Sequence, residues 1–153
     1  MLGLALLLSC FTAFSANAQI SVTATAGTLG PTAYTTLGGA GGAFAAINAG
    51  THQGAITISI TGNVTETAAC VLNSSGAGTA SYTSVLIQPT VDGVTISGPT
   101  VTGRGLIELN GADNVTIDGD NPNTGGTNRN LTITNTASNT ITYTMGIRVA
   151  VAT

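Results

Sequence analysis

Two stretches of the sequence decide the predicted fold, SVLIQPTVDGVTISG (84–98) and GLIELNGADNVTIDG (105–119). Their second halves superpose at an offset of 21 residues, and their first halves align better at 22. A repeat of this length, built from short β runs, matches one coil of a parallel β-helix, in which each run stacks on its equivalent about 4.8 Å away. The sequence therefore predicts an all-β fold, a right-handed parallel β-helix (solenoid) with a short N-terminal helical cap.

This prediction fixes which side chains should stack inside the solenoid. The expected pairs are Val94 with Val115, Ile96 with Ile117, Val85 with Ile107, and Ile87 with Leu109. The offset preserves which face of the strand each side chain takes, so these pairs should all point into one apolar interior. Segments that lay antiparallel, or in separate sheets, would contradict the β-helix.

Two other all-β or repeat architectures fit the sequence less well. A leucine-rich repeat of similar length needs a Leu-x-x-Leu-x-Leu frame, which the chain lacks. An antiparallel sandwich needs two-residue hairpin turns between successive strands, and few Asn-Gly or Asp-Gly pairs stand where they could serve. We interpret the pairs that exist, such as Asn110-Gly111, as corners between faces of a coil.

The N-terminus has the pattern of a secretory signal, which we assign to residues 1–18. The run from Leu2 to Phe14 is apolar but too short to span a bilayer, and Ala16-Asn17-Ala18 fits a small-x-small cleavage site. The stretch ending in Cys10 also resembles a lipobox, so an acylated Cys10 is the alternative. Cleavage after Ala18 would leave Cys70 as the remaining cysteine and permit no intrachain disulfide, which favours a buried, small apolar role for Cys70.

Two further regions follow the signal. Residues 19–54 are predicted to form an N-terminal extension with a cap helix over 43–49, ended by Gly50. Residues 55–153 are predicted to form the first coils of the β-helix, opening with a strand in which Ile56, Ile58 and Ile60 alternate with polar residues. The sequence stops in mid-strand, so we expect it to be the N-terminal fragment of a longer protein.

Composition narrows the class of partner. Charged residues make up 6% of the chain and hydrophobic residues 42%, with 28 Thr and no Lys or Trp. Such a chain is too apolar for intrinsic disorder, and its solubility must depend on Thr, Asn, Ser and Gly rather than on charge. Three arginines (Arg104, Arg129 and Arg148) and a net charge of −3 cannot neutralise a row of phosphates. We therefore expect no nucleic-acid partner, and no transmembrane segment in the mature chain.

The stretch GLIELNGADNVTIDG followed by NRNLTITNT (128–136) resembles the right-handed parallel β-helix proteins of the pectin-lyase-like superfamily. More narrowly, the chain looks like the large secreted surface proteins of Bacteroidetes that commonly end in a type IX sorting domain, over roughly residues 34–149. The resemblance implies export and a β-helix, with adhesion or polysaccharide contact as the usual suggestions. No sorting domain is present in the sequence.

Candidate chemistry is sparse. The resemblance implies that a polysaccharide lyase with this fold would carry Ca²⁺-binding carboxylates and a basic residue on one outward face. In this sequence no three of the six acids share a predicted face. Asp92 and Asp113 fall on equivalent turns and could stack, but a role as corner-forming side chains is the stronger interpretation. Asp118, Asp120 and Asn123 resemble half of a calcium loop without its closing Glu, so an ordinary Asx/Gly loop is the stronger interpretation.

His52 has no other ligand-type residue at metal-binding spacing, so we interpret it as a surface or cap-packing residue. We accordingly assign no catalytic, cofactor-binding or metal residue and no cofactor. The predicted function is adhesion or polysaccharide contact by an exported cell-surface or extracellular β-helix module, secreted and non-catalytic. Its expected partners are extracellular polysaccharide or cell-surface glycans. The alternative is the N-terminal part of a carbohydrate-active enzyme, a lyase or glycoside hydrolase, with its active site on later coils.

Two further expectations concern the last coil. An offset of 40 residues places Ile147 on Ile107 and Val149 on Leu109, which makes Arg148 the outward neighbour of Glu108, as an exposed pair worth at most about 1 kcal/mol. An uncapped last coil would also expose unpaired backbone groups. Residues 19–153 are therefore expected to associate as their concentration rises.

Overall fold

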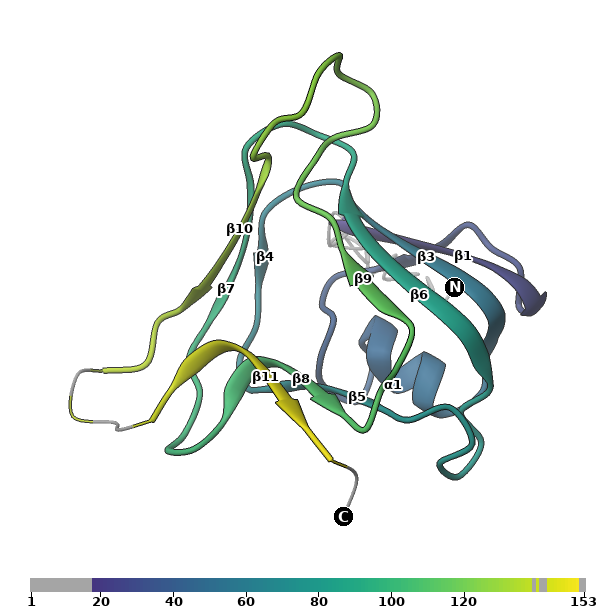
Figure 1. Ribbon diagram of the computed structural model, residues 1–153, viewed down its shortest axis with the longest axis horizontal. Coiled ribbons are helices and arrows are strands. Elements are labelled where there is room, and N and C mark those ends of the chain that lie inside the picture. Colours follow the sequence, from purple (N-terminus) through teal and green to yellow (C-terminus); the bar gives the residue numbers. More distant parts are fainter. Residues whose placement is uncertain (1–17, 139, 141–142, 152–153) are drawn as a thin grey trace, which may run out of the picture.

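The chain forms a mostly β structure around one apolar core (Figure 1). The computed structural model describes residues 18–138, 140 and 143–151, so the predicted signal, including Cys10, lies outside the described residues except for Ala18. In chain order the elements are β1 (Ile20–Gly27), β2 (Thr32–Tyr34), α1 (Ala43–Asn48), β3 (His52–Ile60), β4 (Val64–Thr65), β5 (Cys70–Asn73), β6 (Tyr82–Pro89), β7 (Val94–Gly98), β8 (Gly105–Asn110), β9 (Val115–Ile117), β10 (Leu131–Asn135) and β11 (Met145–Ala150).

The described strands form three separate sheets. Sheet A is mixed and has the order β2-β1-β3-β6-β9, whereas sheet B (β10-β7-β4) and sheet C (β11-β8-β5) are parallel. From β3 onward the chain visits sheets A, B and C in turn, so strands three apart in chain order are neighbours. Figure 1 shows the three sheets as the sides of a triangle that encloses the core.

The prediction of a right-handed parallel β-helix with coils of 21 to 22 residues is wrong. β7 lies in sheet B and β9 in sheet A, so the segments related by 21 residues are in separate sheets. β6 and β8, the segments related by 22 residues, are likewise divided between sheets A and C. The separation of paired residues also varies between strand pairs: it is 29 for Ile56 and Val85 but 40 for Ile107 and Ile147. Three small sheets, one of them mixed, take the place of the uniform solenoid.

The apparent repeat reflects shared strand-and-turn chemistry rather than stacking. Both copies of the repeat contain a short strand and end in a glycine, Gly98 and Gly119, yet the two glycines have different surroundings. A Cβ atom on Gly98 would lie 2.5 Å from the carbonyl oxygen of Glu66, whereas nothing lies within 4 Å of one on Gly119. Alternation identifies a strand and its inward face, but it does not identify the neighbouring strand.

The predicted alternation of apolar and polar residues is confirmed in β3, where the sequence showed it most clearly. In β3 the side chains of Ile56, Ile58 and Ile60 are buried and the residues between them are not. The strands β6, β7 and β8 continue the same core, with buried inward residues Val85, Ile87, Val94, Ile96, Ile107 and Leu109.

At one end of the molecule, which we call the closed end, β1, β2 and α1 cover the core. β1 pairs antiparallel with β3 on one side and with β2 on the other. The predicted helix over 43–49 is confirmed as α1, whose Phe44 and Ile47 are buried. Its first turn packs so closely on the preceding loop that a Cβ on Gly42 would lie 2.0 Å from the Gly38 carbonyl oxygen. Among the described residues, no helix is both long and apolar enough to cross a membrane.

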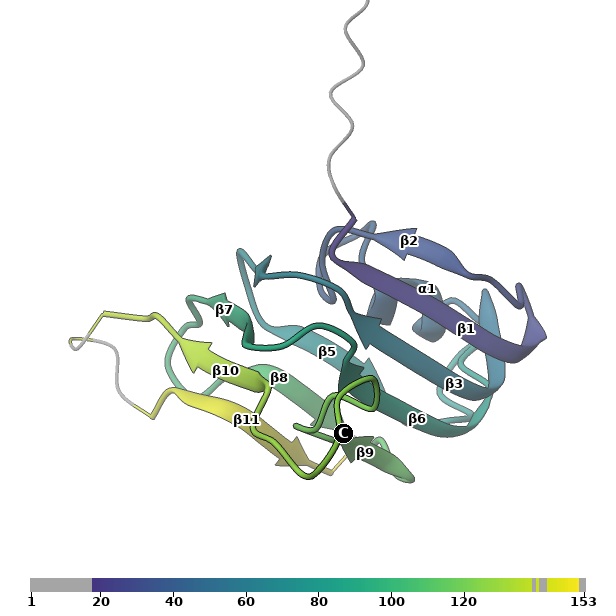
Figure 2. The ribbon, with the colours of Figure 1, turned by 90° about the horizontal axis from the view of Figure 1, so that it is seen from above.

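At the opposite end, which we call the open end, β9, β10 and β11 are the outermost strands of their sheets (Figure 2). Their inward apolar side chains are only partly covered: Val115, Ile117, Leu131 and Ile133 are half-buried, and Ile147 and Val149 are exposed. The alternation of these strands matches that of buried strands. What differs is that nothing among the described residues packs over them.

Candidate functional site

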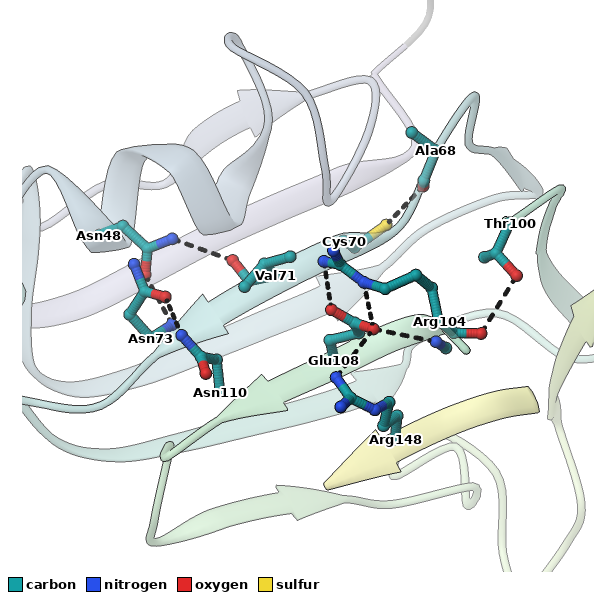
Figure 3. A network of polar contacts seen from close by, with 11 residues as sticks. Asn48, Ala68, Cys70, Val71, Asn73, Thr100, Arg104, Glu108, Asn110 and Arg148 are labelled. Carbon is teal, nitrogen blue, oxygen red and sulfur yellow. Dashed lines mark hydrogen bonds and ion pairs between the residues drawn. The ribbon is translucent and has the colours of Figure 1, made fainter. Parts of the chain in front are cut away.

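Three charged side chains meet on sheet C, on the face that points away from the core (Figure 3). Glu108 lies in the middle of β8 and is 2% exposed. Arg104, in the turn before β8, donates from Nη2 to Oε2 at 2.5 Å and from Nε to Oε1 at 2.7 Å. The Gly105 N–H donates to Oε1 at 3.1 Å. One carboxylate is thus held by a two-point guanidinium contact and by the backbone of its own strand.

Arg148 of β11 completes the group, which we call the Arg–Glu–Arg cluster. It is the register partner of Glu108, and its Nη1 atom lies 3.4 Å from Oε1. The predicted 40-residue offset and the pairing of Glu108 with Arg148 are therefore confirmed. The predicted exposure of the pair is wrong, because the Glu108 side chain is 3% exposed while the arginines are 43% and 39% exposed. Arg104 was not predicted, although its position four residues before an acid in a strand was an available signal.

Glu108 remains ionised in this setting. Burial by itself would raise the pKa of Glu108, but the hydrogen bonds from Arg104 and Gly105, with the charges of both arginines, lower it below its usual value. The hydrogen bond to Glu108 in turn raises the pKa of Arg104. The cluster therefore carries two fixed positive charges and one fixed negative charge, and its outer, accessible atoms belong to the arginines.

A hollow of about 340 Å³ adjoins the cluster between the β4–β5 and β7–β8 connections. Its lining is formed by Thr67, Ala68, Ala69, Pro99, Thr100, Val101 and Arg104. A second hollow of about 250 Å³ lies between α1 and β5 and also reaches Ala69. The two hollows together extend from α1 across the outside of β5 to Arg104, with apolar side chains and the exposed Thr67 hydroxyl along the larger one.

A ladder of asparagines crosses the other end of the same face (Figure 3). Asn48 of α1 donates from Nδ2 to the Val71 carbonyl at 2.9 Å and accepts the Asn73 N–H at 3.0 Å, so its amide serves the backbone edge of β5 as a neighbouring strand would. Asn73 and Asn110 are register partners, and Asn110 donates to Asn73 Oδ1 at 3.0 Å. These contacts align α1, β5 and β8.

Glu66, a second buried acid, fastens the closed end. It is 2% exposed and accepts the Leu37 N–H at 2.5 Å and the Gly38 N–H at 3.1 Å. Neither spacing nor composition distinguished Glu66 from the exposed acids, because its partners are backbone groups of a distant loop.

Cys70 lies fully buried beside this contact. Burial raises the pKa of its thiol, and the charge of Glu66 and a hydrogen bond with it raise the pKa further. The thiol donates to the Ala68 carbonyl at 3.7 Å. The prediction of a buried, packing cysteine is confirmed, since a protonated and covered thiol is a poor nucleophile.

His52 is fully buried at the junction of β1, β2 and β3. One ring nitrogen lies 2.7 Å from the Tyr34 hydroxyl and the other lies 2.6 Å from the Thr28 carbonyl oxygen. Tyr34 also packs edge-on against the ring, with centroids 5.8 Å apart. The cap-packing interpretation of His52 is confirmed.

Asp92 and Asp113 do not come together. Asp92 follows the end of β6 and accepts a hydrogen bond of 2.7 Å from Asn121, whereas Asp113 precedes β9 near the start of β6. The proposed stacking of the two acids is wrong because their turns lie at opposite ends of the same strand.

The loop 118–130 is an Asx loop. Asp118 accepts the Asp120 N–H at 3.0 Å, and Asp120 accepts the Asn128 N–H at 2.7 Å. Asn121 accepts the Asn123 N–H, and Asn123 donates to the Thr90 carbonyl, each at 3.0 Å. These side chains bind their own backbone, which is the usual use of Asp and Asn in turns.

Over the described ranges, no group of three or more His, Cys, Asp or Glu side chains is placed to hold a metal ion. No protein-family model matches the chain, and no curated protein or solved structure is significantly similar to it. The geometry of the outer face of sheet C is therefore the main structural indication of a function.

Proposed function

We propose that this chain is an exported, non-catalytic surface module that contacts acidic polysaccharide through the Arg–Glu–Arg cluster and the adjoining hollows. The observation that carries the proposal is that two of the three cations of the chain are held half-exposed on one buried carboxylate. A chain with so few charges places them together here, beside a surface that can receive an extended ligand.

The cluster offers donors in a fixed direction. Arg104 uses Nε and Nη2 on Glu108, which leaves Nη1 directed away from the carboxylate. Arg148 contacts Glu108 through Nη1, with its Nε and Nη2 outside that contact. Guanidinium groups bind carboxylates through charge-assisted, planar hydrogen bonds. Because Glu108 orients both groups in advance, less side-chain entropy is lost on binding.

The hollows suit a sugar chain rather than a small anion. The walls at Ala69, Pro99 and Val101 offer apolar surface for the carbon faces of sugar rings, and the exposed Thr67 offers a hydroxyl group beside them. The second hollow, which also reaches Ala69, extends this surface toward α1. A polymer with one carboxylate per ring could place its charge on the arginines and its rings along the hollows.

The state of the two buried acids favours contact over hydrolysis. A glycosidase uses two carboxyl groups about 5 to 10 Å apart, and the general acid has a raised pKa. Here the pKa of Glu108 is lowered by its arginines, and Glu66 is occupied by the Leu37 and Gly38 N–H groups. Neither carboxyl is placed to donate a proton to a ligand.

Export and surface location are the second part of the proposal. They rest on the signal pattern of residues 1–18 and on a composition in which Thr, Asn, Ser and Gly replace charge. Neither feature requires an enzyme, and both suit a module that remains soluble outside the cell while presenting one polar face.

The test is binding of residues 19–153 to an immobilised polyuronate and to its methyl ester, which removes the charge and keeps the rings. We expect binding to the acid form, weakening with salt, and weak or no binding to the ester. Arg148→Gln should lower the affinity about tenfold or more, because a charge-assisted hydrogen bond contributes about 1.5–3 kcal/mol.

Arg129→Gln is the matched control, since it removes the same charge from the exposed loop 118–130. Equal losses for the two variants would show a non-specific charge effect and contradict the site. Equal binding to acid and ester would contradict the role of the arginines, and release of shortened chains from the polymer would contradict the non-catalytic assignment.

A further inference from the structure

The charge of the candidate site is confined to one end of its surface. Among the described residues that line the two hollows, Arg104 is the one that is charged, and the hollows extend from it toward α1. The residues that flank Glu108 and Arg148 on the outward side of sheet C are uncharged, namely Val71, Asn73, Asn110 and Ala150. A ligand that lies along this surface therefore meets positive charge at one position.

The Arg–Glu–Arg cluster has the net charge to hold one anionic group. Arg104 and Arg148 carry two positive charges, and both contact the single carboxylate of Glu108. The arginines and the Gly105 N–H lower the pKa of Glu108, so its negative charge cancels one of the two positive charges. One ligand carboxylate would neutralise the cluster, and a second would find no unpaired cation in it.

A buried acid lies next to both hollows. Glu66 directly precedes Thr67, which lines the larger hollow, and accepts the N–H of Gly38, which lines the smaller one. Its negative charge is one cause of the raised pKa of Cys70. A carboxylate held over the hollows would be repelled by Glu66 and would lose hydrating water without gaining a cation. The hollows therefore disfavour anionic groups.

The walls of the hollows suit uncharged sugar rings. Val101 is 69% exposed and Ala69 lines both hollows, so apolar surface is accessible along their length. The exposed Thr67 hydroxyl can donate to or accept from a sugar hydroxyl. In the smaller hollow Gly39 is exposed, and nothing lies within 4 Å of the place that a Cβ atom on it would take. A ring can therefore approach this wall closely.

Granting the proposed function, on which this step rests, we propose that the ligand is a sparsely charged polysaccharide in which one uronate is flanked by neutral sugars. The uronate carboxylate binds the Arg–Glu–Arg cluster, and the neutral sugars beside it lie along the hollows toward α1. A polymer with a carboxylate on every ring binds through one of them and places its neighbours over uncharged or repelling surface. Each such neighbour weakens binding, because its desolvation is not offset by a cation.

The test is titration calorimetry of residues 19–153, which carry every described strand and helix, with three oligosaccharides of equal length. One has a single uronate among neutral sugars, the second is an oligouronate charged on every ring, and the third is the first with its carboxyl group reduced to an alcohol. We expect the singly charged oligosaccharide to bind at least about fivefold more tightly than the oligouronate, although the oligouronate has more carboxylates that could occupy the arginines. The alcohol should bind most weakly.

The outcomes separate this proposal from the proposed function. Equal or tighter binding of the oligouronate, still lowered by Arg148→Gln, would overturn the preference for sparse charge and leave the proposed function standing. Absence of binding by both charged oligosaccharides, or equal binding of the alcohol, would overturn both.

A second cation in the hollows should change the preference. Ala68→Arg adds one to the wall of the larger hollow at an exposed position, so the variant should fold. We expect it to tighten binding of the oligouronate at least about fivefold and binding of the singly charged oligosaccharide much less. Ala33→Arg is the matched control, because it adds the same charge to an exposed residue of β2, outside the hollows. Equal effects of the two substitutions on the ratio of the two affinities would overturn the proposal.

Discussion

The two ends of the molecule are built from strands with the same alternation, yet they differ in burial. At the closed end the inward residues of β3 are fully covered, and at the open end those of β11 are exposed. The difference does not come from the strands. It comes from β1, β2 and α1, which cover one end and have no counterpart among the described residues at the other.

Covering the core at the closed end also depends on polar contacts outside the regular hydrogen bonding of the sheets. Glu66 binds two backbone N–H groups of the loop before α1, His52 joins Tyr34 to Thr28, and Asn48 serves the edge of β5. Each replaces hydrogen bonds that water would otherwise provide to a buried group. The comparison shows that covering the core at one end depends on a few polar side chains that form hydrogen bonds outside the regular pairing of the sheets.

The largest expected effect comes from equivalent truncations at the two ends. Leu72 and Val149 both align with Leu109, but Leu72 is fully buried. Leu72→Ala should lower the free energy of unfolding by about 2–5 kcal/mol through the cavity it leaves. Val149→Ala should change it by less than about 0.5 kcal/mol. Urea unfolding at a concentration where the chain is monomeric would measure both, and equal losses would mean that the ends do not differ as described.

The next largest effect is expected at the contact between Glu66 and the loop before α1, which holds the closed end together. Glu66→Gln keeps the size of the side chain but offers one acceptor oxygen where two N–H groups are held, so we expect a loss of about 1–3 kcal/mol in unfolding free energy. Asp113→Asn is the control, because Asp113 is exposed. An unfolding free energy unchanged by Glu66→Gln would show that this contact does not hold the loop.

A third prediction uses pH on sheet C. The folded pKa of Glu108 lies below its ordinary value of 4.5, so its contribution to stability is present above that value and is lost as the pH falls through the folded pKa. The difference in unfolding free energy between the protein and Glu108→Gln should therefore be constant from about pH 7 to about pH 5 and shrink at lower pH. A difference that grew on acidification would contradict the ionised state of Glu108.

The smallest expected effect is a stabilisation of β11, the strand of sheet C at the open end. Ala150 is the register partner of Asn110, so Ala150→Asn should add a rung to the asparagine ladder and stabilise β11 by about 0.5 kcal/mol. Ala150→Asp has the same shape but no side-chain N–H donor, and it should give no gain. A rise of about 1–3 °C in the melting temperature would be measurable by calorimetry.

The sequence predicted what depends on alternation and on local signals. The strand over 56–60, the helix over 43–49, the buried Cys70 and the register of β11 against β8 are all confirmed. The neighbours of the other strands were predicted wrongly, because a run such as VTISG fits any of the three sheets equally well. The length of each connection decides which sheet a strand joins, and connections tolerate change in length.

The Arg–Glu–Arg cluster was predicted only in part, because strand register can be predicted from sequence more easily than the path of a turn. Opposite charges at an expected register identified Glu108 and Arg148, but the two-point contact of Arg104 depends on how a turn folds back. Glu66 could not be predicted at all, since its partners are peptide groups that every residue carries. A carboxylate that binds the backbone of a loop distant in the sequence leaves no pattern by which its partners could be found.

Because Cys70 is buried, chemical labelling of its thiol can time the opening of the closed end. A thiol-reactive reagent cannot reach this sulfur, or find it deprotonated, until the loop bound by Glu66 separates from β5. The rate of labelling of residues 19–153 by such a reagent would therefore report how often that end opens, with no residue changed to introduce the label. A ligand or partner that slowed labelling would be one that restrains this motion, even if it bound at the opposite end.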